Sequence, residues 1–286
     1  MIQAQDKDAL RVVMRGYRSN SEVTAFVPTL GNLHDGHLSL VRKAKEVADR
    51  VVVSIFVNPT QFDKAEDLAA YPRTLENDLA LLAEENVDLV FLPKTDEMYP
   101  EGSAARVEVD GISDILEGDS RPGHFSGVAT IVAKLFNLVQ PDISVFGKKD
   151  FQQLMLIRRM ERDLDFGIEI IAAPTWREES GLAMSSRNNY LDSTQRNDIA
   201  PSLYAEMLKI KEAILKGDTD YSTLQANSIE ALNQKGFKPD YIEIRNAEDL
   251  SVANKETNKE NKQLVILVSA WLGKARLIDN ITVDLQ

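Results

Sequence analysis

Two hydrophobic patterns alternate along the first 175 residues of the chain. Short apolar runs rich in β-branched residues predict strands over residues 23–29, 51–57, 87–92, 143–146 and 168–172. Between them, apolar residues recur at helical spacing and predict helices over residues 37–50, 74–86, 126–139 and 150–163. Thr74 is the expected N-cap of the second helix. This order predicts an α/β fold, a doubly wound parallel sheet whose ligands gather beyond the carboxyl ends of the strands.

The pattern changes after Pro174. Two helices are predicted there, over residues 193–216 and 221–234. Three short strands follow, over residues 241–245, 264–272 and 276–283. The polar residues 254–262 predict an exposed loop. We therefore expect two domains, an α/β domain over residues 1–175 and a smaller C-terminal α+β domain over residues 176–286.

Composition narrows the class of protein. Of the 286 residues, 43% are hydrophobic and 27% are charged, which is typical of a soluble globular chain. No apolar run approaches the roughly 20 residues that a membrane-spanning helix needs. The polar N-terminus is not expected to be a signal peptide. The chain has no cysteine, which excludes disulfide and thiolate chemistry and makes the cytoplasm the simplest location.

The charge argues against nucleic acid as a partner. The chain has 45 acidic and 33 basic residues and a net charge of −12. General affinity for nucleic acid depends on neutralising phosphates with Lys and Arg, so a chain this acidic is a poor binder. An anionic substrate would need local basic residues, and their positions are therefore informative.

All three histidines fall in two short segments. His34 and His37 lie on the predicted turn between the 23–29 strand and the 37–50 helix, where backbone N–H groups and the helix dipole favour a phosphate. Imidazoles there can stabilise charge on a transferring phosphoryl group, and Gly31 and Gly36 allow close approach. One alternative is a pair of capping histidines on a surface loop. A metal site completed by His124 ranks below phosphate contact, because zinc usually has Cys, Asp or Glu beside His.

Amide side chains follow the 51–57 strand. Asn58 and Gln61 lie at its carboxyl end, beside the histidine turn if the two strands pair. Uncharged amides can bind hydroxyls and carboxylates without committing a charge. The alternative is an ordinary Asn-Pro turn.

Two later segments carry groups that suit an anion. Lys148 and Lys149 come between a strand and a helix, where they suit a triphosphate, although a solvated lysine pair would look the same. Ser185, Ser186 and Arg187 lie near the predicted domain junction, and they suit either an anion-binding loop or a linker.

Seven motifs are spread over nearly the whole chain: Pro28-Thr29-Leu30-Gly31…His34-Asp35-Gly36-His37, Phe56-Val57-Asn58-Pro59-Thr60-Gln61-Phe62, Tyr71-Pro72-Arg73-Thr74, Arg121-Pro122-Gly123-His124-Phe125, Phe146-Gly147-Lys148-Lys149-Asp150-Phe151-Gln152-Gln153, Met184-Ser185-Ser186-Arg187-Asn188 and Arg276-Leu277-Ile278-Asp279-Asn280. The first and sixth look like the HIGH and KMSKS-type signatures of a wider nucleotidyl-transferring superfamily. Together the seven motifs resemble those of the pantoate–β-alanine ligase (pantothenate synthetase) family.

The resemblance implies a Rossmann-like first domain, a C-terminal lid domain and a two-step reaction. The carboxylate of (R)-pantoate attacks the α-phosphorus of ATP to give pantoyl adenylate and diphosphate. The amine of β-alanine then attacks the adenylate to give pantothenate and AMP. Mg²⁺ would accompany ATP, and the chain would be a cytoplasmic homodimer with neither nucleic acid nor membrane as a partner.

The resemblance also implies residue roles. His34, His37 and Lys149 would be catalytic, with His37 the proton donor. Gln61, Gln153 and Asn58 would bind pantoate, and Gln61 also lies at the β-alanine position. No protein metal site is implied. The residues expected at ATP are Leu30, Gly31, Asn32, Leu33, His34, Asp35, Gly36, His37, Gly147, Lys148, Lys149, Asp150, Trp176, Met184, Ser185, Ser186 and Arg187.

Two departures and three alternatives accompany this hypothesis. Leu30 stands where the family usually has Met, a change close in volume, and Lys148 stands where it usually has Glu, which could alter ATP affinity or Mg²⁺ handling. A cytidylyl- or adenylyltransferase with another acceptor is disfavoured by Gln61 and Gln153. A histidine metalloenzyme is the second alternative. The third, an idle nucleotide-binding or scaffold protein, is disfavoured by the presence of His34, His37, Lys149 and Arg187.

Overall fold

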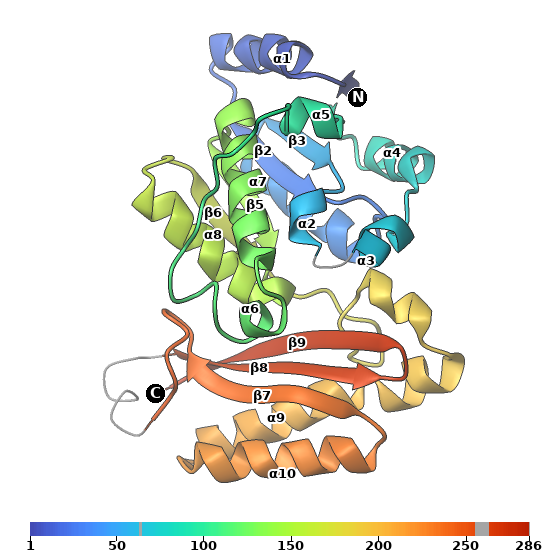
Figure 1. Cartoon of the computed structure of the whole chain (residues 1–286), viewed down its shortest axis with the longest axis vertical. Helices are drawn as coiled ribbons and strands as arrows, with labels where there is room; N and C mark the ends of the chain where they lie inside the picture. Colours follow the sequence, from blue (N-terminus) through green and yellow to red (C-terminus); the bar gives the residue numbers. More distant parts are fainter. Residues whose placement is uncertain (63–64, 255–262, 286) are drawn as a thin grey trace. The chain divides into compact units, whose positions relative to one another are not determined.

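The computed structural model describes residues 1–62, 65–254 and 263–285. It divides into two compact units (Figure 1). The first unit is Met1–Gly147 with Gln152–Pro174, and the second is Lys148–Phe151 with Thr175–Gln286. We keep the domain boundary between residues 175 and 176 as a proposal, because the two compact units place residues 148–151 with the C-terminal part of the chain.

A six-stranded parallel sheet forms the centre of the first unit, which confirms the predicted α/β class. The strand order is β1-β4-β3-β2-β5-β6. The five predicted strands are present with shifted ends, and β1 is a short additional edge strand. The bounds are β1 Ile2–Ala4, β2 Thr24–Thr29, β3 Arg50–Ile55, β4 Leu89–Phe91, β5 Ile143–Gly147 and β6 Glu169–Ala173.

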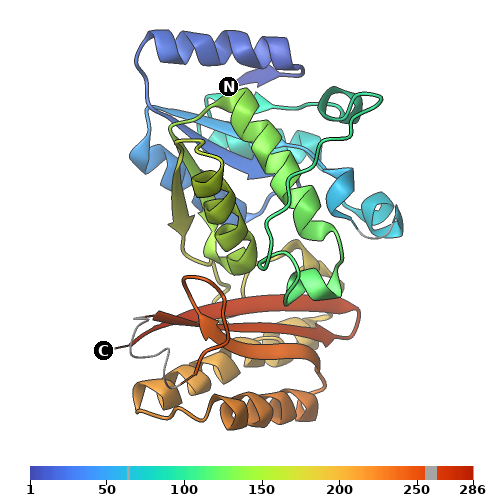
Figure 2. The same cartoon turned by 60° about the vertical axis from the view of Figure 1, so that its left-hand side comes forward.

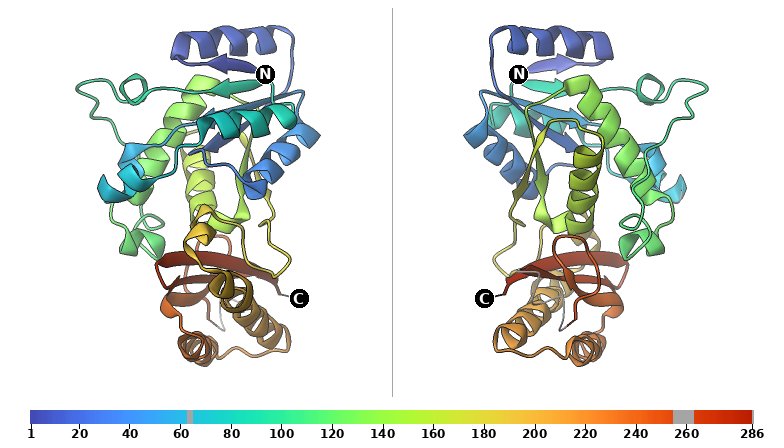
Figure 3. Two further views of the ribbon diagram at one scale, coloured as in Figure 1. Left: turned by 90° about the vertical axis from the view of Figure 1, so that its right-hand side faces the viewer. Right: turned by 90° about the vertical axis from the view of Figure 1, so that its left-hand side faces the viewer.

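Helices cover both faces of this sheet. Ala25 and Val27 of β2 pack in one core cluster with Val41 of α2, Asp35–Val47. Side chains alternate along a strand, so Phe26 points to the opposite face, where α7, His124–Val139, contacts β2. Figure 3 shows α2 and α7 on opposite sides of the strands. The other helices are α1 Lys7–Ser19, α3 Ala65–Ala70, α4 Leu75–Glu84, α5 Thr95–Met98, α6 Glu117–Ser120 and α8 Phe151–Asp163.

The second unit contains an antiparallel sheet in the order β7-β8-β9. Two helices lie on one face of this sheet in both views (Figures 1 and 2), and their apolar residues share a core with the strands. The predicted α+β class is confirmed. The bounds are α9 Ser202–Leu215, α10 Tyr221–Gln234, β7 Lys238–Asn246, β8 Gln263–Leu272 and β9 Ala275–Asp284.

Several expectations about single elements need correction. The continuous helix over 193–216 is wrong: a π-helical turn, Gln195–Ile199, precedes α9, because Pro201 has no N–H to continue the α-helical ladder. Thr74 is the N-cap of α4, but it makes no side-chain cap; its hydroxyl donates to Asp78. Helix α1 was not predicted. Of the expected 254–262 loop, residues 255–262 lie outside the described part of the chain. No described helix is both long enough and apolar enough to cross a bilayer.

Candidate functional site

Three loops leave the carboxyl edge of the parallel sheet at neighbouring strands. Strand β2 lies between β3 and β5, so the loop with both histidines is central. The loop with Asn58 and Gln61 follows β3 on one side. Strand β5 ends on the other side at Gly147. This edge is where ligands bind in sheets of this type.

The turn before the histidines is held by a buried carboxylate. Gly31 and Asn32 both have positive φ, 83° and 52°. The Asn32 and Leu33 N–H groups donate to Asp78 at 2.9 and 2.8 Å, and Asp78 is 1% exposed. The N–H groups of Asn32 and Leu33 therefore already have a protein acceptor, so any contact of these two residues with a ligand would involve other atoms or a shared hydrogen bond. The sequence did not single out Asp78, because an acid in the first turn of an amphipathic helix is ordinary.

His34 and His37 cap the start of α2 with the same ring atom. His34 Nδ1 accepts the Gly36 N–H at 3.1 Å, and His37 Nδ1 accepts the His34 N–H at 3.4 Å. Their ring centroids are 4.1 Å apart. A neutral imidazole that accepts through Nδ1 carries its proton on Nε2, so each ring has an Nε2–H donor. The capping interpretation and the phosphate interpretation are thus compatible.

Asn58 fixes the side chain of Gln61. Asn58 is fully buried, and its Nδ2 donates to the Gly127 carbonyl and to Gln61 Oε1, both at 3.1 Å. Its Oδ1 accepts the Tyr99 hydroxyl at 2.8 Å and the Thr60 hydroxyl at 3.0 Å. Both ends of the Asn58 amide therefore have protein partners, and a substrate would have to share or displace one of them.

Tyr99 was not singled out from the sequence, because it is distant along the chain and follows no strand-end pattern. Burial raises the pKa of its hydroxyl, and the hydrogen bonds to Thr60 and Asn58 offset part of the rise. The hydroxyl therefore stays a protonated donor toward Asn58.

His124 contacts the main chain of Gln61. Its Nδ1 lies 2.7 Å from the Gln61 carbonyl oxygen, and Arg121 Nη2 donates to the same oxygen at 3.2 Å. Within residues 1–62, 65–254 and 263–285, no group of three or more His, Asp or Glu side chains is arranged to hold a metal ion.

The two glutamines that open α8 differ in their surroundings. Gln152 is 4% exposed and closes the preceding loop, because its Nε2 donates to the Ile112 and Ile115 carbonyls and its Oε1 accepts the Glu117 N–H. Gln153, the predicted pantoate ligand, is half-buried beside it.

In the second unit, the lysine turn is held through its backbone. Asn280 Nδ2 donates to the Lys148 carbonyl at 2.9 Å and the Lys149 carbonyl at 2.8 Å. Lys149 Nζ lies 3.5 Å from Asp150 Oδ1. Because these contacts involve main-chain atoms of Lys148, they do not depend on whether Lys or Glu stands there.

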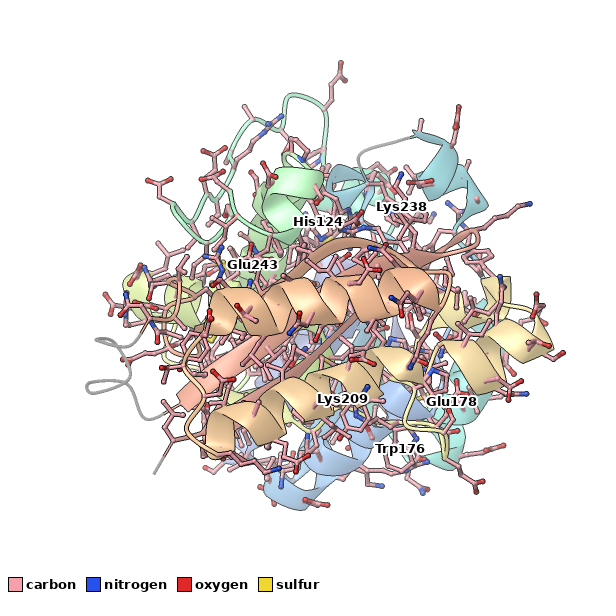
Figure 4. The ribbon with its side chains drawn as sticks, turned by 90° about the horizontal axis from the view of Figure 1, so that it is seen from below. His124, Trp176, Glu178, Lys209, Lys238 and Glu243 are labelled. Carbon is pink, nitrogen blue, oxygen red and sulfur yellow. The ribbon has the colours of Figure 1, made fainter. Side chains whose placement is uncertain are left out.

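The segment before Arg187 is folded by polar side chains of the same unit. The Met184 N–H donates to the Trp176 carbonyl at 2.9 Å, and Trp176 is 44% exposed. Figure 4 labels Trp176 among the side chains of this part of the chain. Ser185 Oγ accepts the Arg187 N–H at 3.3 Å and caps the short helix η3, Ser186–Tyr190. Asn188 is buried and donates to Glu178 at 2.9 Å. The folded turn argues against a flexible linker over these residues.

A bidentate ion pair lies beneath this segment. Arg177 donates to both carboxylate oxygens of Asp279, at 2.6 and 2.9 Å, and stacks 3.6 Å from the centre of the Tyr204 ring. Burial raises the pKa of the Asp279 carboxyl, and the guanidinium offsets part of that rise. The ion pair with Arg177 gives Asp279 of the 276–280 motif a structural role.

We expect Arg177→Met to lower the free energy of unfolding of the second unit by about 3–5 kcal/mol, because it strands a buried carboxylate. Both tryptophans, Trp176 and Trp271, belong to this unit, so urea unfolding followed by tryptophan fluorescence measures it directly. Lys216→Met, at an exposed pair with Glu212, is the control and should cost at most about 1 kcal/mol.

The pH dependence provides a second check on this variant. Without Arg177, the folded-state pKa of Asp279 rises further above its unfolded value, so the folded state gains more from binding a proton. The loss in free energy of unfolding caused by Arg177→Met should therefore become smaller as the pH falls. A loss that is constant, or that grows toward acid pH, would show that the missing charge pair is not its cause.

Comparison with known proteins identifies the family. The model of the family described as pantoate–β-alanine ligase matches residues 3–282. The crystal structure of pantothenate synthetase from Thermus thermophilus is 44% identical over 98% of this chain and 99% of that one, with a TM-score of 0.89. A Francisella tularensis pantoate–β-alanine ligase, complexed with β-γ ATP and β-alanine, is 38% identical over 98% and 97% of the two chains, with a TM-score of 0.81. The chain belongs to the pantoate–β-alanine ligase family.

Proposed function

We propose roles for the described residues in the activity of this family, the ATP-dependent condensation of (R)-pantoate with β-alanine through pantoyl adenylate. The observation that carries the proposal is the pair of adjacent imidazoles, each with its Nδ1 occupied by a backbone N–H at the start of α2. This arrangement puts the proton of each ring on Nε2, in the central loop at the carboxyl edge of the sheet, where ligands bind in folds of this type.

In the first step, a pantoate carboxylate oxygen attacks the α-phosphorus of ATP and diphosphate leaves. His34 and His37 donate hydrogen bonds through Nε2 to phosphate oxygens. We assign the family's proton-donor role to His37 as an Nε2–H hydrogen bond to the leaving diphosphate, in which the ring keeps its proton. Lys149 stabilises the negative charge that develops on the phosphoryl group. Such a step needs positioned donors and cations, and no covalent nucleophile.

Gln61 and Gln153 are proposed to hold pantoate. Asn58 already occupies Gln61 Oε1, so the NH₂ end of the Gln61 amide is the end assigned to a ligand oxygen. A neutral donor suits this task, because a lysine clamped on the carboxylate would lower its nucleophilicity. In the second step, the β-alanine amine attacks the acyl carbon of the adenylate and AMP leaves, with Gln61 also at the β-alanine position.

The remaining ATP contacts are proposed for each unit separately. In the first unit they are the loop residues Leu30, Gly31, Asn32, Leu33, Asp35 and Gly36, together with Gly147. In the second they are Lys148, Asp150, Trp176, Met184, Ser185, Ser186 and Arg187. Arg187 is the cation of its segment, and its backbone is fixed by Ser185.

Four further points belong to the same proposal. Mg²⁺ enters as part of the MgATP substrate, since Mg²⁺ in such sites relies on the phosphates and water for most of its ligands. The C-terminal α+β domain acts as a lid. The chain forms a homodimer. The reaction consumes ATP, which makes the cytoplasm the proposed location.

Omission of single substrates tests the assignment. AMP formation should require ATP, pantoate and β-alanine together for sustained turnover, measured by a coupled AMP assay. Equal AMP formation without pantoate would contradict it. Turnover with CTP in place of ATP would favour the cytidylyltransferase alternative, and the absence of AMP under all conditions would favour the idle nucleotide-binding protein.

A further inference from the structure

His124 has no role in the proposed reaction, yet it contacts Gln61, a residue proposed to bind pantoate. The Gln61 carbonyl oxygen can only accept hydrogen bonds, so His124 Nδ1, 2.7 Å away, must be the donor. Arg121 Nη1 lies 3.3 Å from His124 Nε2. A guanidinium can only donate, so Nε2 is the acceptor and His124 is the neutral Nδ1–H tautomer.

Arg121 contacts both members of this pair. Its Nη2 donates to the Gln61 carbonyl at 3.2 Å while its Nη1 faces the His124 ring. The planar guanidinium fixes the two contacts relative to each other. The Gln61 carbonyl therefore receives two donors from one turn, residues 121–124, which leads into α7 through Gly123 with a φ of 82°.

Helix α7 packs its backbone closely against residues 60–61. A Cβ on Gly127 would lie 2.3 Å from the Thr60 carbonyl oxygen, so the helix backbone is in direct contact with residues 60–61. The Gly127 carbonyl also accepts from Asn58, which in turn donates to Gln61 Oε1. Gln61 is thus held at its main chain by Arg121 and His124 and at its side chain by Asn58.

We propose that Arg121 and His124 are positioning residues for pantoate, acting through the Gln61 main chain to hold its side-chain NH₂ in place. The inference rests on the proposed role of Gln61 as a pantoate ligand. We call the contacts of Arg121 and His124 with the Gln61 carbonyl the clamp. If the Gln61 side chain is fixed before pantoate binds, it loses less rotamer freedom on binding, so the clamp should raise the affinity for pantoate and leave the affinity for ATP unaffected.

Steady-state kinetics on the full chain test the clamp. Asn places a side-chain N–H where His124 has Nδ1, whereas Gln places it where His124 has Nε2. We expect His124→Ala and His124→Gln to raise the KM for pantoate about tenfold, the loss typical of one or two hydrogen bonds. His124→Asn should stay within about twofold of the parent, and the KM for ATP should change less than about twofold in all three.

A double-mutant cycle separates the clamp from the role of Gln61 itself. If Gln61→Ala leaves the KM for pantoate unchanged, the proposed ligand role of Gln61 is wrong. If Gln61→Ala raises it, the clamp predicts that adding His124→Ala causes no further rise, because both changes remove the same contribution. A multiplicative further rise would overturn the clamp while leaving Gln61 as a ligand.

Two other results would also overturn it. One is His124→Gln performing as well as His124→Asn, and the other is equal rises in the KM for ATP and pantoate, which general damage to the fold would cause. Circular dichroism checks folding. If His124→Ala does not fold, the Asn and Gln variants and Arg121→Lys, which keeps the charge but loses the paired geometry, decide the question in the same assay.

Discussion

Lys149→Ala is expected to lower kcat for adenylate formation by on the order of a thousandfold, measured as pantoate-dependent release of diphosphate from ATP. The ammonium is the cation proposed to stabilise the transferring phosphoryl group, and its loss removes charge at the step itself. The turn should survive the substitution, because Asn280 holds the Lys149 carbonyl and makes no use of its side chain. The far-UV circular dichroism and the urea midpoint should therefore match the parent.

The neighbouring lysine provides the matched control. Lys148→Ala removes the same charge from the same turn, and Asn280 holds the Lys148 carbonyl in the same way. Its effect should be less than about tenfold and mainly on the KM for ATP, as for a cation that binds without acting on the reacting phosphorus. Equal losses of kcat in both variants would remove the special role of Lys149.

His37→Ala is expected to lower kcat by about a hundredfold to a thousandfold, the usual cost of one preorganised donor to a developing charge. The assigned donor is Nε2, so the replacement that keeps an N–H nearest that position should retain the most activity. His37→Gln places its amide nitrogen there, and His37→Asn does not. We expect the Gln variant to exceed the Asn variant by at least about tenfold in kcat.

Comparing the Asn and Gln variants at His37 and at His124 tests which ring nitrogen is the donor at each position. At His124 the structure assigns the donor to Nδ1, so Asn should be the better replacement there. At His37 it assigns the donor to Nε2, so Gln should be the better one. The same order at both positions would contradict at least one of the tautomer assignments.

The sequence predicted the strands that are buried on both faces of the sheet and most of the helices whose apolar residues recur at regular spacing. The β3 run is apolar at nearly every position because both faces of the sheet are covered, and it was readily recognised. Helix α1 was missed although Leu10, Met14 and Tyr17 recur at helical spacing behind an Asp6 N-cap. The break at Pro201 was hidden because the apolar stripe continues across the π-helical turn into α9.

The contacts that shape the site could not be read from local pattern. Asp78 reaches the histidine turn from 45 residues away, and His124 reaches Gln61 from 63 residues away. Only the folded chain shows that one acid holds the loop amides and one imidazole holds a carbonyl. The residue types of the site were visible in the sequence, while the partners that fix their tautomers and orientations were not.

The hydrogen bonds made by Asn280 affect where a C-terminal fragment of the protein should begin. A fragment that begins at Thr175 contains all of β7, β8 and β9, and it would be the natural choice for expressing the C-terminal part alone. It would lack Lys148 and Lys149, whose carbonyls accept both hydrogen bonds of the Asn280 amide. In the full chain Asn280 is 5% exposed and its amide donates to both carbonyls, so the fragment would lose two hydrogen bonds of this side chain. We therefore expect a fragment that carries the 148–151 turn, for instance as a peptide joined ahead of Thr175, to be more stable than one that begins at Thr175.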